Sequence, residues 1–194
     1  MSTGYDWYIL ANQKYTGKTT VNGVDGVNTT VDFSDWQFIP NSNFDFVKSL
    51  LANNGEERCK VVFSHSAYES RKSWIKETQD KDNGYIYPCI YGLTQQDGIK
   101  VWYSSTNSNG HFGVKKVVVP CSKYTDAFID NGKYGLCQFA FGIAFDTKEE
   151  GEGIKKALLS EKFQKIWQAT EWIYNGKEWR MFKYFRKDFW KEFI

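Results

Sequence analysis

Acidic residues beside a lysine are the first candidates for chemistry in this sequence. Metal-dependent nucleases of the PD-(D/E)xK class need carboxylates that hold a metal ion and a lysine that polarises the attacking water. One triplet fits the last part of that pattern, Asp146-Thr147-Lys148, with Asp146 and Lys148 as the candidate catalytic residues. Thr147 and Glu150 also form a T-x-x-E capping box for a following helix, which is the simpler interpretation. The nuclease therefore stays an alternative function, and no metal-binding residues are assigned.

Three other catalytic motifs are incomplete. The "GKTT" at 17–20 lacks the earlier glycine of a phosphate-binding P-loop, because position 12 is Asn. The "GYIYPCIYG" at 84–92 places the two halves of a GIY-YIG nuclease motif too close together to form two strands. The prolines are not adjacent, and no Gly-rich turn joins a strand to a helix, so an adenine methyltransferase site is absent. These incomplete motifs argue against an enzymatic function without deciding it, and we expect no cofactor.

The histidines and cysteines do not form a recognisable ligand set. His65 and His111 are the only histidines, so a zinc site or a nucleophilic triad has few partners. The cysteines are widely spaced, form no C-x-x-C pair and lie beside apolar residues, as free core thiols do. They are Cys59, Cys89, Cys121 and Cys137.

The start of the chain and its hydropathy bear on location. The opening "MSTGYDWYIL" lacks the pattern of a secretory signal, and no segment has the apolar length of a membrane span. We expect an intracellular, reduced protein of the cytoplasm or nucleoid, or one packaged in a virion, with no membrane partner.

Aromatic residues are the unusual feature of the composition, at 18% of the chain. They fill cores, and they also stack on nucleic-acid bases. The formal net charge is only +2, from 25 basic and 23 acidic residues. That balance argues against a protein that coats nucleic acid by bulk charge, but it leaves a local basic surface open.

Two stretches, 107–135 and 177–191, combine basic and aromatic residues. Lysine and arginine hold phosphates, while Tyr, Asn and Arg read or stack on bases. In a strand, Lys115 and Lys116 point to opposite faces, so at most one contacts a partner from the open side. In a helix, Arg180, Lys183 and Lys187 of the second stretch fall at i, i+3 and i+7 and would share a face. The predicted DNA-contacting residues are Lys115, Lys116, Lys123, Tyr124, Lys133, Arg180, Lys183 and Lys187.

The pattern along the chain predicts an α+β fold, with a mixed or antiparallel sheet and helices concentrated in the C-terminal third. Pro88 suggests an edge position for its strand. Residues 16–30 read as a loop or loose hairpin. The expected strands are 5–12, 59–64, 85–93, 98–105, 112–120 and one continuous strand after the turn within 130–145.

Helices are expected at 41–57, capped by Asn43, and as one or two segments within 146–172, broken near Ser160. The aromatic tail is expected to end in a short helix. We predict a single domain over 1–194, with 1–85 as a candidate N-terminal lobe and 86–194 as a recognition-like region. The polar run at 66–84 is the candidate boundary.

From about residue 86 onward, the order of features resembles the C-terminal target-recognition region of adenine-specific DNA methyltransferases of restriction–modification type. The similarity is to Eco57I- or TaqI-like proteins of bacteria and large DNA viruses. The matching pieces, in order, are "GHFGVKKVVVP", "DNGKYGLCQFAFGIAF", "EEGEGIKKALLSEKFQKIWQATEW" and "FRKDFWKEF". Family members carry the methyltransferase domain ahead of this region, whereas here Met1 opens a different stretch.

The resemblance implies a module that recognises double-stranded DNA and presents an adenine to a catalytic domain. A separate methyltransferase or nuclease subunit is then a candidate partner. Only structural positions carry over, namely the Gly132-Lys133-Tyr134-Gly135 turn and the strand after it. We expect both glycines to serve the turn through positive φ angles, Tyr134 to be packed and Lys133 to contact phosphate.

The leading hypothesis is a DNA-binding, target-recognition-like protein with no chemistry of its own. One alternative is a structural or assembly protein, such as a viral particle component, that reuses this scaffold. The other is the divalent-metal-dependent nuclease built around Asp146 and Lys148.

Overall fold

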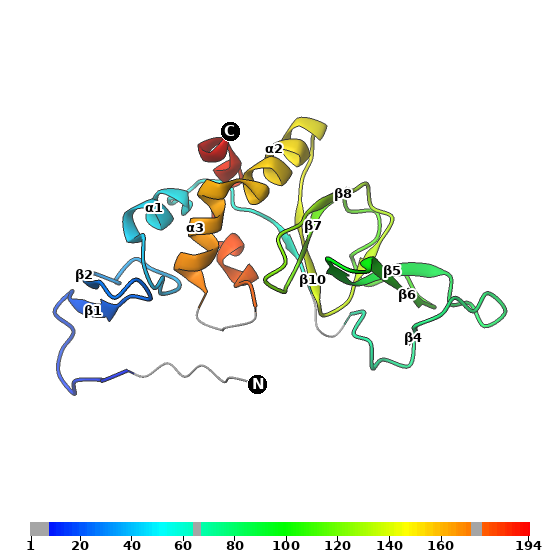
Figure 1. Ribbon diagram of the computed structural model, residues 1–194, viewed down its shortest axis with the longest axis horizontal. Coiled ribbons are helices and arrows are strands. Elements are labelled where there is room, and N and C mark those ends of the chain that lie inside the picture. The colour runs from blue at the N-terminus through cyan, green and yellow to red at the C-terminus, as the bar shows by residue number, and fades with distance from the viewer. Residues whose placement is uncertain (1–7, 64–66, 172–175) are drawn as a thin grey trace.

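The computed structural model describes residues 8–63, 67–171 and 176–194, and it is an elongated α+β protein (Figure 1). At one end lies a small antiparallel hairpin of β1 (Thr19–Asn22) and β2 (Asn28–Val31), which confirms the loose hairpin expected there. The predicted strand at 5–12 is wrong for residues 8–12, which are exposed and outside any strand. Its first residues lie outside the described part of the chain.

The central sheet has the strand order β3-β10-β7-β8, and every pair in it is antiparallel. Its strands are β3 (Val61–Val62), β10 (Ala140–Ala144), β7 (Lys116–Pro120) and β8 (Phe128–Asp130). One face packs on the helices through a large hydrophobic cluster, and the other packs on the second sheet through a smaller one. The central sheet is therefore the middle layer of the protein.

The second sheet has the order β4-β6-β5-β9. Its strands are β4 (Ile75–Lys76), β6 (Gly98–Ser104), β5 (Tyr87–Thr94) and β9 (Gly135–Leu136). The edge position suggested by Pro88 is wrong, because β5 lies between β6 and β9. The parallel pairing with β9 starts at Cys89, so the missing N–H of Pro88 costs no ladder hydrogen bond on that side.

The continuous strand expected after the Gly132-Lys133-Tyr134-Gly135 turn is wrong. The chain forms β9 in the second sheet, turns at Gln138 and Phe139, and then enters the central sheet as β10. The apolar residues on both sides of the turn are buried, so the hydropathy pattern is the same for one strand as for two. The segment joins the two sheets.

Helices α2 (Lys148–Leu159) and α3 (Glu161–Thr170) lie in the C-terminal third and meet at Ser160, which ends one helix and caps the next. This confirms the predicted break. Thr147 caps α2 by accepting a hydrogen bond from the Glu150 N–H, while the Glu150 carboxylate accepts one from the Asp146 N–H. The first bond satisfies an N–H group that the helix start leaves free, as the capping box predicted, whereas the second reaches the residue before the cap.

Helix α1 (Phe44–Leu50) is shorter than expected, and the predicted cap is wrong. Asn43 has φ 51°, and its side chain makes no capping hydrogen bond. The tail forms two 3-10 helices, η1 (Trp179–Lys183) and η2 (Phe189–Phe193), and the second confirms the short terminal helix.

The main core is rich in aromatic rings. Phe163, Phe182 and Phe189 are fully buried between α3, the tail and the central sheet. Val47 and Leu50 of α1 belong to the same cluster, so the described part of 1–85 shares its core with the later residues. Within the described residues, no helix is long and apolar enough to cross a membrane.

Candidate nucleic-acid interface

Lys116, a predicted DNA contact, is a buried structural residue. Its side chain is 0% exposed, and its ammonium group donates to Asp130 Oδ2 at 2.6 Å and to the backbone oxygens of His111 and Val114. Burial lowers the pKa of Lys116, and the hydrogen bond to Asp130 opposes that shift. An ammonium has three donors, and all three are used, so the prediction is wrong for this residue. The alternation of β7 leaves Lys115 exposed instead.

The Asp130 carboxylate holds the turn that follows it. Besides Lys116, it accepts hydrogen bonds from the backbone N–H groups of Lys133 and Tyr134. Gly132 has φ 95°, as expected for a turn glycine. Gly135 does not have a positive φ angle. A Cβ at this position would lie 2.7 Å from Cys89 Sγ, so the absence of a side chain permits close packing.

The two central residues of the turn have different roles. Tyr134 packs against the cluster between the sheets, whereas Lys133 is exposed, with its Nζ 5.0 Å from the Tyr134 ring centroid. The turn therefore presents Lys133 to solvent from a rigid base.

His111 lies beside this ion pair and is also buried. Its Nδ1 accepts a hydrogen bond from the Leu136 N–H. Burial, followed by the charge of Lys116, lowers the pKa of His111 to about 4. The imidazole is therefore neutral at pH 7 and acts as a fixed acceptor for β9.

We predict that the stability of the protein falls between about pH 6.5 and pH 4. The folded-state pKa of His111 is about 4, below its unfolded value of 6.5, so the unfolded chain binds the proton first. The contribution is complete above pH 6.5 and is lost as the pH falls towards 4, by up to about 3 kcal/mol. Urea unfolding of wild type and His111→Asn across this window isolates it, because other groups titrate in both proteins. Equal pH slopes for the two proteins would contradict the prediction.

One end of the central sheet carries a row of lysines. Because neighbouring strands are antiparallel, β3 and β7 begin at the end where β10 and β8 finish. The Ala144 N–H donates to Lys60 O, and the Phe145 N–H donates to Lys115 O, so the backbones of Lys60 and Lys115 lie on the two sides of the end of β10. Lys133 follows β8, Lys148 begins the helix after β10, and Lys187 pairs with Asp146, so all three lie near this end of the sheet. We call these five residues, Lys60, Lys115, Lys133, Lys148 and Lys187, the lysine edge.

Most of the lysine edge is uncompensated. Lys60, Lys115, Lys133 and Lys148 are exposed, and none of them has a carboxylate at ion-pair distance among the residues that the structure describes. Lys187 pairs with both Asp146 and Glu57. Strands lie about 4.8 Å apart, so the end of a four-stranded sheet spans about 14 Å, the length of about four phosphate steps of one DNA strand.

The candidate nuclease residues lie at this edge but are not arranged as a metal site. Asp146 pairs with Lys187, and that hydrogen bond, helped by the charges of Lys60 and Lys115, lowers the pKa of Asp146. Lys148 is in the first turn of α2, and the described structure contains no hydrogen bond or ion pair between it and Asp146. No group of three His, Cys, Asp or Glu side chains able to hold a metal ion occurs in the described parts of the chain.

The remaining predicted contacts lie at the other end of the central sheet. Lys123 and Tyr124 follow β7, and the backbone oxygen of Tyr124 accepts a hydrogen bond from Lys177. Burial lowers the pKa of Lys177 to about 8. Lys123 lies 3.4 Å from Glu171, so its charge is partly balanced.

The Arg180 Cζ atom and the Lys183 Nζ atom each lie 5.0 Å from the centroid of the Trp179 ring. Trp179 in turn contacts Phe63, which follows β3 at the end away from Lys60. The shared helical face expected for Arg180, Lys183 and Lys187 is wrong, because the tail is broken between η1 and η2.

The structure thus brings together Lys115, Lys133 and Lys187, and separates them from the other predicted contacts. Sequence reasoning missed Lys60 as a member of the row and assigned Lys148 only to a nuclease. Lys60 stands beside a two-residue strand, and only the strand pairing places it next to Lys115.

Comparisons with protein-family models, with curated protein sequences and with solved structures find no match to this chain. The functional argument therefore depends on the residues and geometry described above.

Proposed function

We propose that this protein binds double-stranded DNA through the lysine edge, as a target-recognition-like module without chemistry of its own. The observation that carries the proposal is the row of Lys60, Lys115, Lys133 and Lys148 at one end of a rigid sheet. Exposed cations gathered at one end of a sheet suit the repeated phosphates of a duplex, which position a protein on DNA without specifying the sequence. The sequence resemblance to a methyltransferase recognition region implies the same partner.

The salt dependence of duplex binding tests the proposal. Four phosphate contacts predict that log Kobs for a duplex falls with log salt with a slope of about −3 to −4. The double variant Lys115→Ala/Lys133→Ala should reduce the magnitude of that slope by about 2 and weaken binding about tenfold or more. Fluorescence anisotropy of a labelled random-sequence duplex measures both quantities.

The matched control is Lys81→Ala/Lys165→Ala, which removes two exposed lysines away from the lysine edge. Its salt slope and affinity should remain those of the wild type. Equal losses in the two double variants, or no duplex binding at low salt, would contradict the proposal. Magnesium-dependent cleavage abolished by Asp146→Ala would favour the nuclease instead.

An assembly role is the second candidate, and one observation favours it. Tyr8, Ile9 and Leu10 are consecutive apolar residues and are 81%, 84% and 82% exposed. Contiguous exposed apolar side chains mark interaction surfaces in many proteins. A stable oligomer by light scattering, together with no affinity for DNA, would favour this function over the first.

A further inference from the structure

A group of three aromatic side chains, two partly buried and one exposed, lies on the outer sheet, away from the lysine edge. The rings of Tyr91 and Trp102 are stacked, with centroids 4.5 Å apart and planes 8° from parallel. Phe139 meets Tyr91 edge-on at 5.0 Å and is itself 47% exposed. We call Tyr91, Trp102 and Phe139 the aromatic platform.

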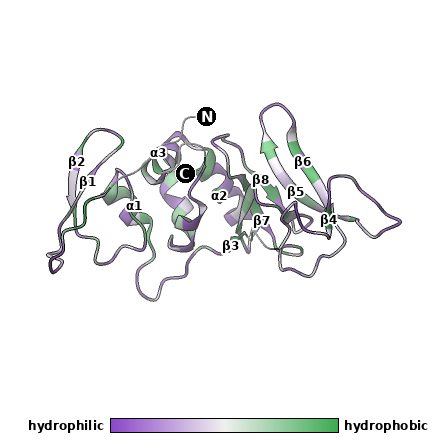
Figure 2. Ribbon diagram, turned by 90° about the horizontal axis from the view of Figure 1, so that it is seen from below, coloured by the Kyte–Doolittle hydropathy of each residue, from purple (hydrophilic) through white to green (hydrophobic). Residues whose placement is uncertain are grey.

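The aromatic platform is held by two segments of backbone. Tyr91 and Trp102 come from the β5–β6 hairpin, which stands out from the body in Figure 2 and carries hydrophobic residues along both strands. Phe139 comes from the turn that joins the two sheets, and its Cβ lies 3.6 Å from the position that a Cβ on Gly92 would occupy. A Cβ at position 92 would therefore be in ordinary van der Waals contact with Phe139.

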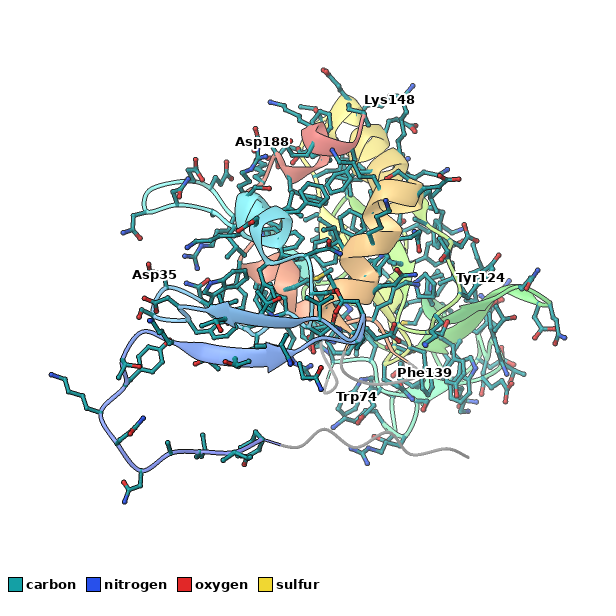
Figure 3. The ribbon with its side chains drawn as sticks, turned by 60° about the vertical axis from the view of Figure 1, so that its left-hand side comes forward. Asp35, Trp74, Tyr124, Phe139, Lys148 and Asp188 are labelled. Atoms are coloured by element: carbon teal, nitrogen blue, oxygen red, sulfur yellow. The ribbon has the colours of Figure 1, made fainter. Side chains whose placement is uncertain are left out.

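The two surfaces are distinct. Phe139 precedes β10 and Asp146 follows it, so the aromatic platform and the lysine edge lie towards opposite ends of that strand. Figure 3 agrees, with Lys148 and Phe139 far apart in the view. A ligand on one surface does not cover the other.

A positive charge lies beside the rings. Lys100 Nζ is 5.4 Å from the Tyr91 centroid and 5.9 Å from that of Trp102. It pairs with Glu77 at 2.7 Å, and its side chain is 46% exposed. Trp102 Nε1 is buried and has no hydrogen-bond partner in the described structure, so this ring is held by packing alone.

We propose that the aromatic platform is a second nucleic-acid site, which stacks an unpaired base of a single strand while Lys100 approaches the neighbouring phosphate. Base–aromatic stacking accepts any base, because each has a π face, and cations beside the rings hold the backbone. A sugar ring would need several free polar side chains around the rings. The nearest amide, Gln138, already has both of its polar atoms bonded to Ser70.

The test compares single-stranded and duplex probes of one length. Phe139→Ala removes the most exposed ring and should weaken binding of a fluorescent thymidine oligonucleotide about tenfold, while the affinity for duplex changes less than about twofold. Tyr91→Leu should give a similar loss. The control is Ile99→Ala, because Ile99 is 44% exposed on the same hairpin, one residue from Lys100 and hence on the opposite face of β6.

Tryptophan emission gives an independent signature. Stacking of a base on Trp102 should quench part of the emission when the oligonucleotide binds, and Trp102→Phe should lose that part. Unchanged single-strand affinity in Phe139→Ala, or an equal loss in Ile99→Ala, would overturn the proposal. Binding of an oligosaccharide that Phe139→Ala abolishes would overturn it in favour of a carbohydrate.

The two proposals fail separately. Normal duplex binding with no single-strand binding would overturn only the aromatic platform. Single-strand binding that depends on Phe139, without any duplex binding, would support the platform and overturn the lysine edge.

Discussion

Asp130→Ala is expected to lower the free energy of unfolding by about 3–5 kcal/mol, because it leaves the Lys116 ammonium buried without its counter-charge. The two side chains are 1% and 0% exposed, and the bond between them is 2.6 Å long. The same carboxylate accepts the N–H groups of Lys133 and Tyr134, so the substitution also releases the turn. Urea denaturation, with the midpoint and slope fitted together, measures the loss.

Two further variants distinguish the loss of the Lys116–Asp130 ion pair from a general effect of substitution on stability. Lys116→Met/Asp130→Leu replaces the ions by apolar groups and should recover much of the lost stability, because breaking a buried pair costs more than removing it. Glu77→Ala breaks the exposed ion pair with Lys100 and should change stability little, because water screens that pair. A small effect of Asp130→Ala, equal to that of Glu77→Ala, would contradict the prediction.

This ion pair also bears on the lysine edge. Lys115 precedes β7 and Lys133 follows β8, and Lys116 and Asp130 are the partners that close the pairing of these strands. The buried salt bridge therefore fixes the spacing between two lysines that we propose to hold phosphates. The buried Lys116 thus helps to position the two exposed lysines of that proposal.

Local signals in the sequence predicted the starts of α2 and α3. Thr147 and Ser160 each accept a hydrogen bond from an N–H three residues on, which depends only on nearby residues. Asn43 carries the same kind of side chain but takes a left-handed conformation and does not cap α1. A residue type that favours caps also favours turns, and the packing of the chain chooses between them.

The sequence pattern could not predict features that depend on contacts between residues far apart in the chain. "GVKKVVVP" shows that Lys115 and Lys116 differ in direction, but the burial of Lys116 depends on Asp130, fourteen residues later. The turn between β9 and β10 lies inside an apolar run, since both parts are buried, although in different sheets. The lysine edge needs the strand order, which no local pattern contains.

Phe182→Ala is expected to be the most destabilising substitution in the apolar core, at about 3–5 kcal/mol. The ring is 0% exposed and has centroids of five other rings within 6 Å, at 5.8 Å for Phe141, 5.9 Å for Phe163, 5.4 Å for Trp167, 5.4 Å for Phe185 and 5.6 Å for Phe189. Truncation removes buried area and leaves a cavity between rigid rings that cannot close around it. A domain of this size has about 5–15 kcal/mol of stability, so this loss is a large share.

The contacts of Phe182 explain why its truncation should destabilise several elements of the fold. It lies in η1, a short 3-10 helix that has little stability of its own, and its contacts join the tail to α3 and to the central sheet. Phe139→Ala is the matched control, since it makes the same change at a ring that is 47% exposed, and it should cost far less. Phe182→Leu fills part of the space and should fall between the two. Equal urea midpoints for Phe182→Ala and Phe139→Ala would show that the tail does not anchor the core, and would leave the helices and the central sheet to hold each other without it.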